Sequence, residues 1–129
     1  MKKGDETFRE WTEGEIAFSR IELEHADLHI HSHYSDGCFS VPEVLRKAQE
    51  RGAKVVSLTD HDGVRGLQEA RETAEQLSGL RFVPGIEFSA EGPEGEELHI
   101  LGYFIDWENP WFRRTVEWVA QTKALGARV

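Results

Sequence analysis

The chain has 129 residues, 39% of them apolar, and this suffices for one domain with a hydrophobic core. Acidic residues outnumber basic residues by 24 to 15, so the formal net charge is −9. This charge argues against stable nucleic-acid binding by broad phosphate neutralisation, although a nucleic acid could still be a substrate. The chain has a single cysteine and no apolar run of membrane-spanning length. We therefore expect a cytoplasmic protein without membrane association.

Residues 1–25 are expected to form a lead-in to the domain. Residues 1–14 are mostly polar and charged, whereas apolar and polar residues roughly alternate over residues 15–24, which predicts an extended segment there. Residues 26–129 are then expected to form the domain itself.

The first half of the domain alternates between strands and helices. Residues 26–31 alternate in polarity and predict a strand. Ser40 and Glu43 form a capping-box pattern at the start of a helix. A second, buried strand is predicted at residues 54–59 and a second helix at residues 66–78, where apolar residues recur with helical spacing. This order is typical of parallel strands joined by helices.

The second half begins with two further strands. Residues 81–89 predict one continuous strand and residues 98–105 another, and the turn residues 92–95 between them indicate a hairpin-like pair. The dipeptide at 109–110, Asn-Pro, is typical of a helix start. The elements together predict an α/β fold with mainly parallel strands.

Histidines and carboxylates gather at the predicted strand ends. They occur in residues 27–37 (DLHIHSHYSDG), in residues 59–62 (TDHD), in residues 85–87 (GIE) and at His99. The carboxyl ends of parallel strands meet at one edge, so we expect these groups to lie together. Imidazole and carboxylate ligands suit zinc, manganese or iron in a hydrolytic centre. The pattern therefore predicts a metal site.

Several metallohydrolase families begin their metal site with His-x-His, and the spacing after His31 helps to separate them. A metallo-β-lactamase-type site needs His-x-His-x-Asp-His, but Ser35 stands where the aspartate is required and Gly37 follows Asp36. An amidohydrolase-type barrel normally adds a strand lysine as a bridging ligand, and no lysine here lies at a comparable strand end. That second alternative is weaker and stays open.

Taken in order, the four motifs resemble those of the PHP (polymerase and histidinol phosphatase) family of metal-dependent phosphoesterases, over about residues 26–106. The resemblance implies a distorted, TIM-like (β/α)₇ barrel, of which this chain corresponds to about the first half. It also implies two or three divalent ions (Zn, Mn or Fe), with fewer in a partial site. The implied reaction is hydrolysis of a small phosphomonoester, nucleotide or phosphodiester by a metal-bound hydroxide.

The resemblance assigns metal-binding roles to individual residues. His29 and His31 correspond to ligands of the first ion, and Glu87 corresponds to a bridge between the first and second ions. His99 corresponds to a ligand of the second ion. Residues 36 and 61, an aspartate and a histidine, correspond to ligands of a third ion or to groups that assist the metal-bound water.

Other residues near these motifs receive supporting roles. Asp27 and Asp60 are expected to orient ligating imidazoles, which usually donate their second ring N–H to a carboxylate or carbonyl. Arg65 and His33 are candidates for binding substrate phosphate. Cys38 is expected to be a small buried apolar residue.

The family takes further ligands from a second half, but this chain has no histidine after His99. Three explanations stay open: a fragment of a longer chain, a naturally shortened protein, or a half-barrel completed by a second subunit. An open half-barrel exposes strand edges and apolar helix surface, so we expect self-association. The alternative to a phosphoesterase acting on a small phosphorylated substrate is a non-catalytic metal-binding half-barrel with a regulatory or interaction role.

Overall fold

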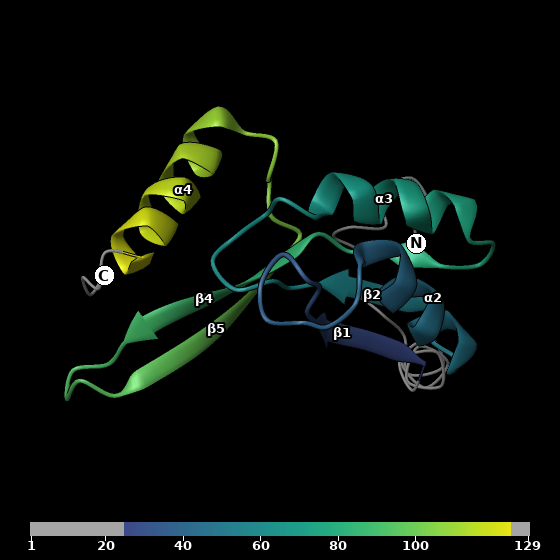
Figure 1. Cartoon of the computed structure of the whole chain (residues 1–129), viewed down its shortest axis with the longest axis horizontal. Helices are drawn as coiled ribbons and strands as arrows, with labels where there is room; N and C mark the ends of the chain where they lie inside the picture. Colours follow the sequence, from purple (N-terminus) through teal and green to yellow (C-terminus); the bar gives the residue numbers. More distant parts are fainter. Residues whose placement is uncertain (1–24, 125–129) are drawn as a thin grey trace, which may run out of the picture.

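The structure, a computed structural model, describes residues 25–124, so residues 1–24 of the predicted lead-in at residues 1–25 lie outside the described residues. The α/β class is confirmed, with a parallel sheet and an antiparallel pair (Figure 1). The elements are, in order, β1 (Ala26–Ile30), α2 (Val41–Glu50), β2 (Val55–Leu58), α3 (Leu67–Gln76), β3 (Arg81–Phe82), β4 (Gly85–Glu91), β5 (Glu97–Tyr103) and α4 (Pro110–Ala124).

The parallel sheet has the strand order β1-β2-β3, with α2 and α3 as the two connections. Right-handed crossovers put both helices on one face of the sheet, which Figure 1 shows. The predicted cap of α2 is confirmed, because the Ser40 hydroxyl accepts a hydrogen bond from the Glu43 backbone N–H at 3.3 Å. The core between sheet and helices includes the buried residues Ile30, Val41, Leu45, Val56, Leu58, Leu67 and Ala70.

The predicted continuous strand at residues 81–89 is wrong, because the chain divides there into β3 and β4. Val83 N–H still donates to the Val56 carbonyl of the parallel sheet at 2.9 Å. Pro84 has no N–H to continue this ladder. The chain therefore turns, and β4 pairs with β5 in the predicted hairpin, from Gly85 opposite Tyr103 to Glu91 opposite Glu97.

Helix α4 begins at the predicted Asn-Pro pair. The Asn109 side-chain oxygen accepts hydrogen bonds from the backbone N–H groups of Trp111 and Phe112, at 2.9 and 3.2 Å. At the other end of the helix, Lys123 forms a 2.7 Å ion pair with Asp62 in the loop after β2. Helix α4 is thus tied to the loop that follows the middle strand. Within residues 25–124 no helix is both long and apolar enough to cross a membrane.

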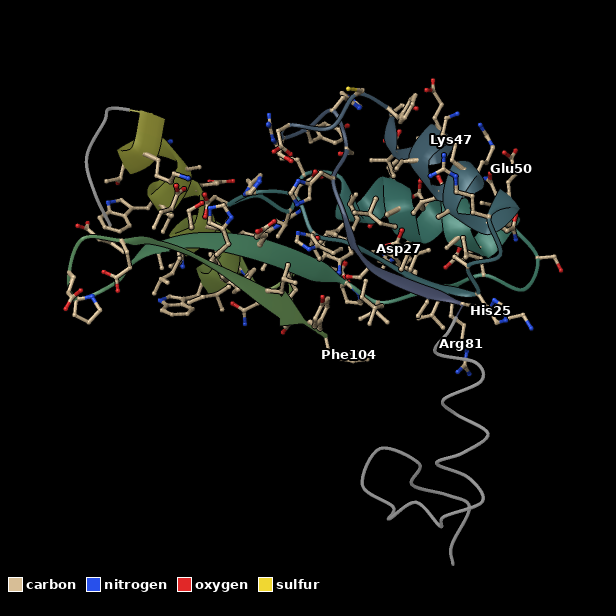
Figure 2. All side chains as sticks on the ribbon, turned by 90° about the horizontal axis from the view of Figure 1, so that it is seen from below. His25, Asp27, Lys47, Glu50, Arg81 and Phe104 are labelled. Carbon is tan, nitrogen blue, oxygen red and sulfur yellow. The ribbon has the colours of Figure 1, made fainter. Side chains whose placement is uncertain are left out.

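Several large apolar side chains are exposed, most of them on the hairpin, directly after it and on α4. Phe104, directly after β5, is 80% exposed (Figure 2). The other exposed large apolar residues among those described are Phe39, Leu98, Ile100, Trp111 and Trp118. Exposed apolar surface of this kind is the basis of the expected self-association, which stays a prediction.

Strand β4 lies very close to β2 at Gly85. A Cβ atom at Gly85 would overlap the Ser57 hydroxyl oxygen and would lie 2.9 Å from the Thr59 methyl carbon. Ser57 Oγ is buried and has no hydrogen-bond partner among residues 25–124. Only glycine allows this approach, which sets the position of β4 relative to the parallel sheet.

Gly85→Ala should lower the free energy of unfolding by about 1–3 kcal/mol, because the added methyl group forces the two strands apart. Thermal and urea unfolding followed by circular dichroism would measure this. Gly102→Ala is the matched control, since its Cβ would lie 3.5 Å from Ile86 Cγ2, an ordinary contact. Adding Ser57→Ala to Gly85→Ala should restore part of the loss, and equal stability of the two single variants would refute this account of the strand contact.

Candidate metal centre

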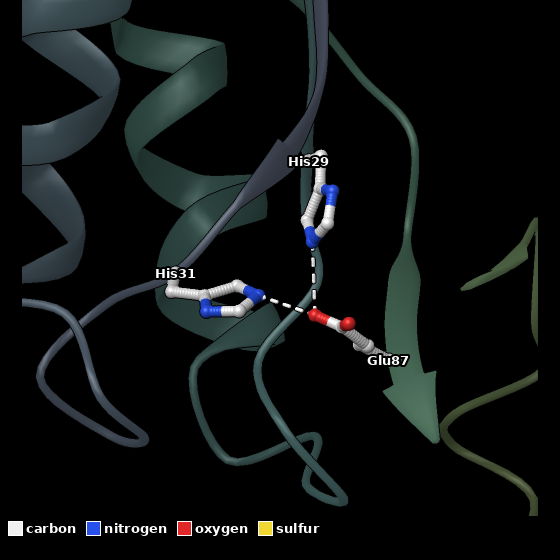
Figure 3. A group of neighbouring side chains, drawn as sticks. All are labelled: His29, His31 and Glu87. Atoms are coloured by element: carbon white, nitrogen blue, oxygen red, sulfur yellow. Dashed lines mark hydrogen bonds and ion pairs between the residues drawn. The ribbon is translucent and has the colours of Figure 1, made fainter. Parts of the chain in front are cut away.

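The carboxylate of Glu87, on β4, lies at the centre of the site and is only 3% exposed. Its Oε1 atom lies 2.9 Å from His29 Nε2 and 2.7 Å from His31 Nε2 (Figure 3). Its Oε2 atom lies 3.0 Å from His99 Nδ1. Histidines from β1, from the segment just after β1 and from β5 therefore converge on a single buried carboxylate.

Local backbone structure explains this convergence. His29 lies within β1 and His31 directly follows it, so strand alternation directs both imidazoles to the same side. On the hairpin, His99 pairs with Ser89, and Glu87 lies two residues before Ser89 on the same face of the pair. The hairpin register therefore brings His99 diagonally next to Glu87.

His61 enters the site through a backbone bridge. It forms an isolated parallel bridge with Glu87, in which Glu87 N–H donates to the Asp60 carbonyl at 3.1 Å and Asp62 N–H donates to the Glu87 carbonyl at 2.9 Å. The His61 Nε2 atom then lies 3.8 Å from Glu87 Oε1. The loop after β2 is thus attached to β4 at the residue that supplies the carboxylate.

Asp36 supplies the second carboxylate of the cluster. Its two oxygens lie 2.6 Å from His31 Nδ1 and 3.2 Å from His61 Nε2. The turn that carries Asp36 closes with a 2.9 Å hydrogen bond from Gly37 N–H to the Ser32 carbonyl. A Cβ atom at Gly37 would overlap the His31 carbonyl, so glycine is required beside this aspartate.

The structure brings all six predicted metal ligands together in three overlapping groups. Within each group the ligand atoms lie within 4.8 Å of one another. The donor set of imidazole nitrogens and carboxylate oxygens fits divalent first-row ions. Each of the central residues 31, 61 and 87 belongs to two groups, so neighbouring ions would share ligands. The groups are His29, His31 and Glu87; His31, Asp36 and His61; and His61, Glu87 and His99.

The cluster shifts the proton affinities of its members. Burial tends to raise the pKa of Glu87, but hydrogen bonds from His29 and His31 and the charge of His61 bring it below its ordinary value. The pKa of Asp36 is also lowered: burial opposes the shift, and the contacts with His31 and His61 outweigh it. The neighbouring imidazoles therefore favour the ionised carboxylates, the form that binds metal.

Asp60 does not orient an imidazole, contrary to prediction. One of its oxygens accepts from Ser32 N–H and from the Ser35 hydroxyl, and the other accepts from the Ser32 hydroxyl, each at 2.7 Å. Asp60 is 4% exposed and Ser32 is fully buried, so these bonds are shielded from water. Asp60 thus fixes the turn between His31 and Asp36.

Asp27 likewise holds no imidazole of the described residues: among residues 25–124 its side chain accepts only a long, 3.4 Å hydrogen bond from the His29 backbone N–H. The carboxylate that contacts a ligand ring is Glu97, which lies 2.9 Å from His99 Nε2. The hydrogen bond to Glu97 raises the pKa of His99; burial opposes the rise, and the charges of Glu97 and Glu87 add to it. Strand alternation puts Glu97 and His99 on one face, and that signal could have identified Glu97.

The remaining predicted residues lie around the cluster. Arg65 donates from Nη2 to the Tyr34 carbonyl at 3.1 Å, and its guanidinium lies over the Tyr34 ring. His33 is exposed, and its ring stacks on the Tyr34 ring with a centroid separation of 4.5 Å. Cys38 is exposed, so the prediction that it is buried was wrong: it lies in the surface loop between β1 and α2.

Comparison with known proteins assigns the family. A family model described as the PHP domain matches residues 27–121, which is well over half of the chain. The chain belongs to the PHP domain family. The matched range contains every residue of the cluster, from His29 to His99.

Curated relatives of this PHP chain carry the names of phosphoester-cleaving enzymes. A phosphoribosyl 1,2-cyclic phosphate 1,2-diphosphodiesterase of Eggerthella lenta is 44% identical over 81 residues, covering 62% of this chain and 30% of the relative. A 3′,5′-nucleoside bisphosphate phosphatase of Chromobacterium violaceum is 39% identical over 84 residues, covering 65% of this chain and 29% of the relative. The chain thus spans less than a third of these relatives' length.

Solved structures show the same partial coverage. A protein described as an amidohydrolase from Chromobacterium violaceum, with bound sulfate and no metal, matches with a TM-score of 0.71 and 33% identity, over 77% of this chain and 34% of the other. A structure from Bifidobacterium adolescentis, described as a candidate metal-dependent phosphoesterase, matches with a TM-score of 0.66 and 30% identity, over 77% and 33%. The PHP domain described here therefore aligns with about a third of each.

Asp60→Asn should destabilise the turn between His31 and Asp36, because an amide cannot accept all three hydrogen bonds. We expect a loss of about 1–3 kcal/mol in unfolding free energy. We also expect Mn²⁺ to bind about 10–100-fold more weakly, as is usual when groups that support ligands are changed. Calorimetric titration and hydrogen exchange at residues 32–37 would measure both effects. Asp106→Asn, at an exposed aspartate, is the control; an identical response in the two variants would remove Asp60 from this role.

Proposed function

We propose that this chain provides the metal centre of a phosphoesterase. The observation that carries the proposal is the convergence of four imidazoles, from His29, His31, His61 and His99, on the buried Glu87 carboxylate. Support also comes from the relatives, whose names denote a diphosphodiesterase, exoribonucleases and a bisphosphate phosphatase. Membership of the PHP family and a donor set suited to divalent ions agree with this reaction class.

In this proposal His29, His31 and Glu87 would hold a first ion, and Glu87 and His99 would hold a second. Residues 36 and 61 would hold a third ion or face the substrate. Divalent ions in such a cluster lower the pKa of a coordinated water and offset charge on phosphate oxygens. Asp36 is exposed beside His61, where its carboxylate can accept a proton from the attacking water.

We infer a ribose phosphate or nucleotide as the substrate class. The named substrates of the Eggerthella lenta and Chromobacterium violaceum relatives both contain a sugar unit bearing phosphate at two places. Zinc, manganese and iron all accept this mixture of imidazole and carboxylate ligands, so cellular availability would select among them.

His31→Ala and Glu87→Gln should each abolish most metal binding and hydrolysis, because each residue belongs to two of the three ligand groups. Metal content after loading with Mn²⁺ or Zn²⁺, and hydrolysis of p-nitrophenyl phosphate, would measure these losses. We expect the rate to fall by more than about 100-fold. His25→Ala, an exposed histidine outside the cluster, is the matched control.

The result also separates the two functions under consideration. Turnover that depends on His31 and Glu87 supports the phosphoesterase. Stoichiometric metal in the unmodified chain without turnover of any phosphate ester supports the non-catalytic metal-binding domain instead. Full turnover by Glu87→Gln would contradict the proposed centre.

A further inference from the structure

A pocket with a volume of about 570 Å³ lies between the loop after β2 and helix α4. Its loop side includes Asp60, His61 and Arg65, and its helix side includes Arg113 and Glu117. Since His61 also belongs to two of the ligand groups, the pocket lies directly beside the candidate metal centre. A molecule bound at the centre through one group could therefore extend into the pocket.

Two guanidinium groups line this pocket without an acidic partner. Arg65 donates to the Tyr34 carbonyl, and Arg113 lies over the Trp107 ring at 5.9 Å. Within residues 25–124 neither arginine forms an ion pair, although Arg71 pairs with Glu108 nearby. Each guanidinium has five N–H donors, so several remain to bind a ligand.

The pocket also contains carboxylates, but two of the three are already engaged. Asp60 accepts hydrogen bonds from Ser32 and Ser35. Asp62 pairs with Lys123 at 2.7 Å and accepts from Ser89 N–H at 2.9 Å. Their charges are thus compensated by protein groups, whereas Glu117 on α4 is exposed and can oppose an anion.

We propose that this pocket binds a second phosphate group of the substrate, one that is not hydrolysed, with Arg65 and Arg113 as its ligands. The identity of the substrate rests on the proposed function, whereas anion binding in the pocket does not. A guanidinium suits this role because its planar fork matches two phosphate oxygens. Arg65 comes from the loop that carries His61 and Arg113 comes from α4, so the phosphate would contact both walls of the pocket.

The test uses the full chain freed of metal by a chelator, with adenosine 3′,5′-bisphosphate as the probe and calorimetry as the readout. Arg113→Gln and Arg65→Gln should each weaken binding about tenfold, equivalent to about 1.4 kcal/mol. Arg114→Gln is the matched control, because this neighbour on α4 is exposed and does not line the pocket. Glu117→Gln should change affinity in the opposite direction and tighten binding.

The outcomes distinguish this inference from the proposed function. An equal loss of affinity for the probe in Arg113→Gln and Arg114→Gln would overturn the pocket assignment. An unchanged affinity in Glu117→Gln would overturn it too. No binding by the metal-free chain would overturn it as well. Arg65 and Arg113 lie on different elements. If Arg65→Gln and Arg113→Gln both bind the probe more weakly while their circular dichroism is unchanged, the two arginines bind a common ligand. Binding that follows the expected order, combined with no hydrolysis of phosphate esters by the metal-loaded chain, would support the pocket and refute the phosphoesterase.

Discussion

A buried negative charge is costly unless charged or polar groups surround it, and Glu87 imposes this constraint on the whole fold. Strand β1 and the segment after it supply two imidazoles to one carboxylate oxygen, and β5 supplies another imidazole to the second oxygen. The close contact of β4 with β2 at Gly85 puts Glu87 within reach of them. The strand order, the register of the hairpin and the spacing between β4 and β2 therefore together determine which groups surround the Glu87 carboxylate.

Asp60 and Asp62, the two aspartates beside His61, have structural roles, whereas His61 belongs to the candidate metal centre. Asp60 binds the serines of the turn that leads to Asp36, whereas Asp62 binds β4 and α4. Asp62, in the loop after β2, also adopts a positive φ of 47°, which few residues other than glycine, asparagine and aspartate tolerate. The backbone of His61 is thus held between two anchored neighbours.

Much of this arrangement was predictable from sequence, because it depends on local patterns. The Ser40 cap and the Asn-Pro helix start depend on neighbours within three residues, and the gathering of ligands follows from strands that end at one edge. Other features depend on contacts that are distant in sequence. The strand breaks at Pro84 because the residues after it pair with β5. The hydrogen bond between Ser32 and Asp60 joins residues that are 28 positions apart in the sequence. The missed role of Glu97 is the exception, since strand alternation alone indicated it.

The candidate metal centre spans both sheets of the molecule, which are joined by the backbone bridge between His61 and Glu87. In the proposed centre, an ion held by His29 and Glu87 would cross-link the parallel sheet to the hairpin. Its binding free energy would then add to the free energy of folding, since the unfolded chain has no such preformed site. Metal supply and conformational stability would therefore be thermodynamically linked, with the hairpin held most firmly in the metal-loaded protein.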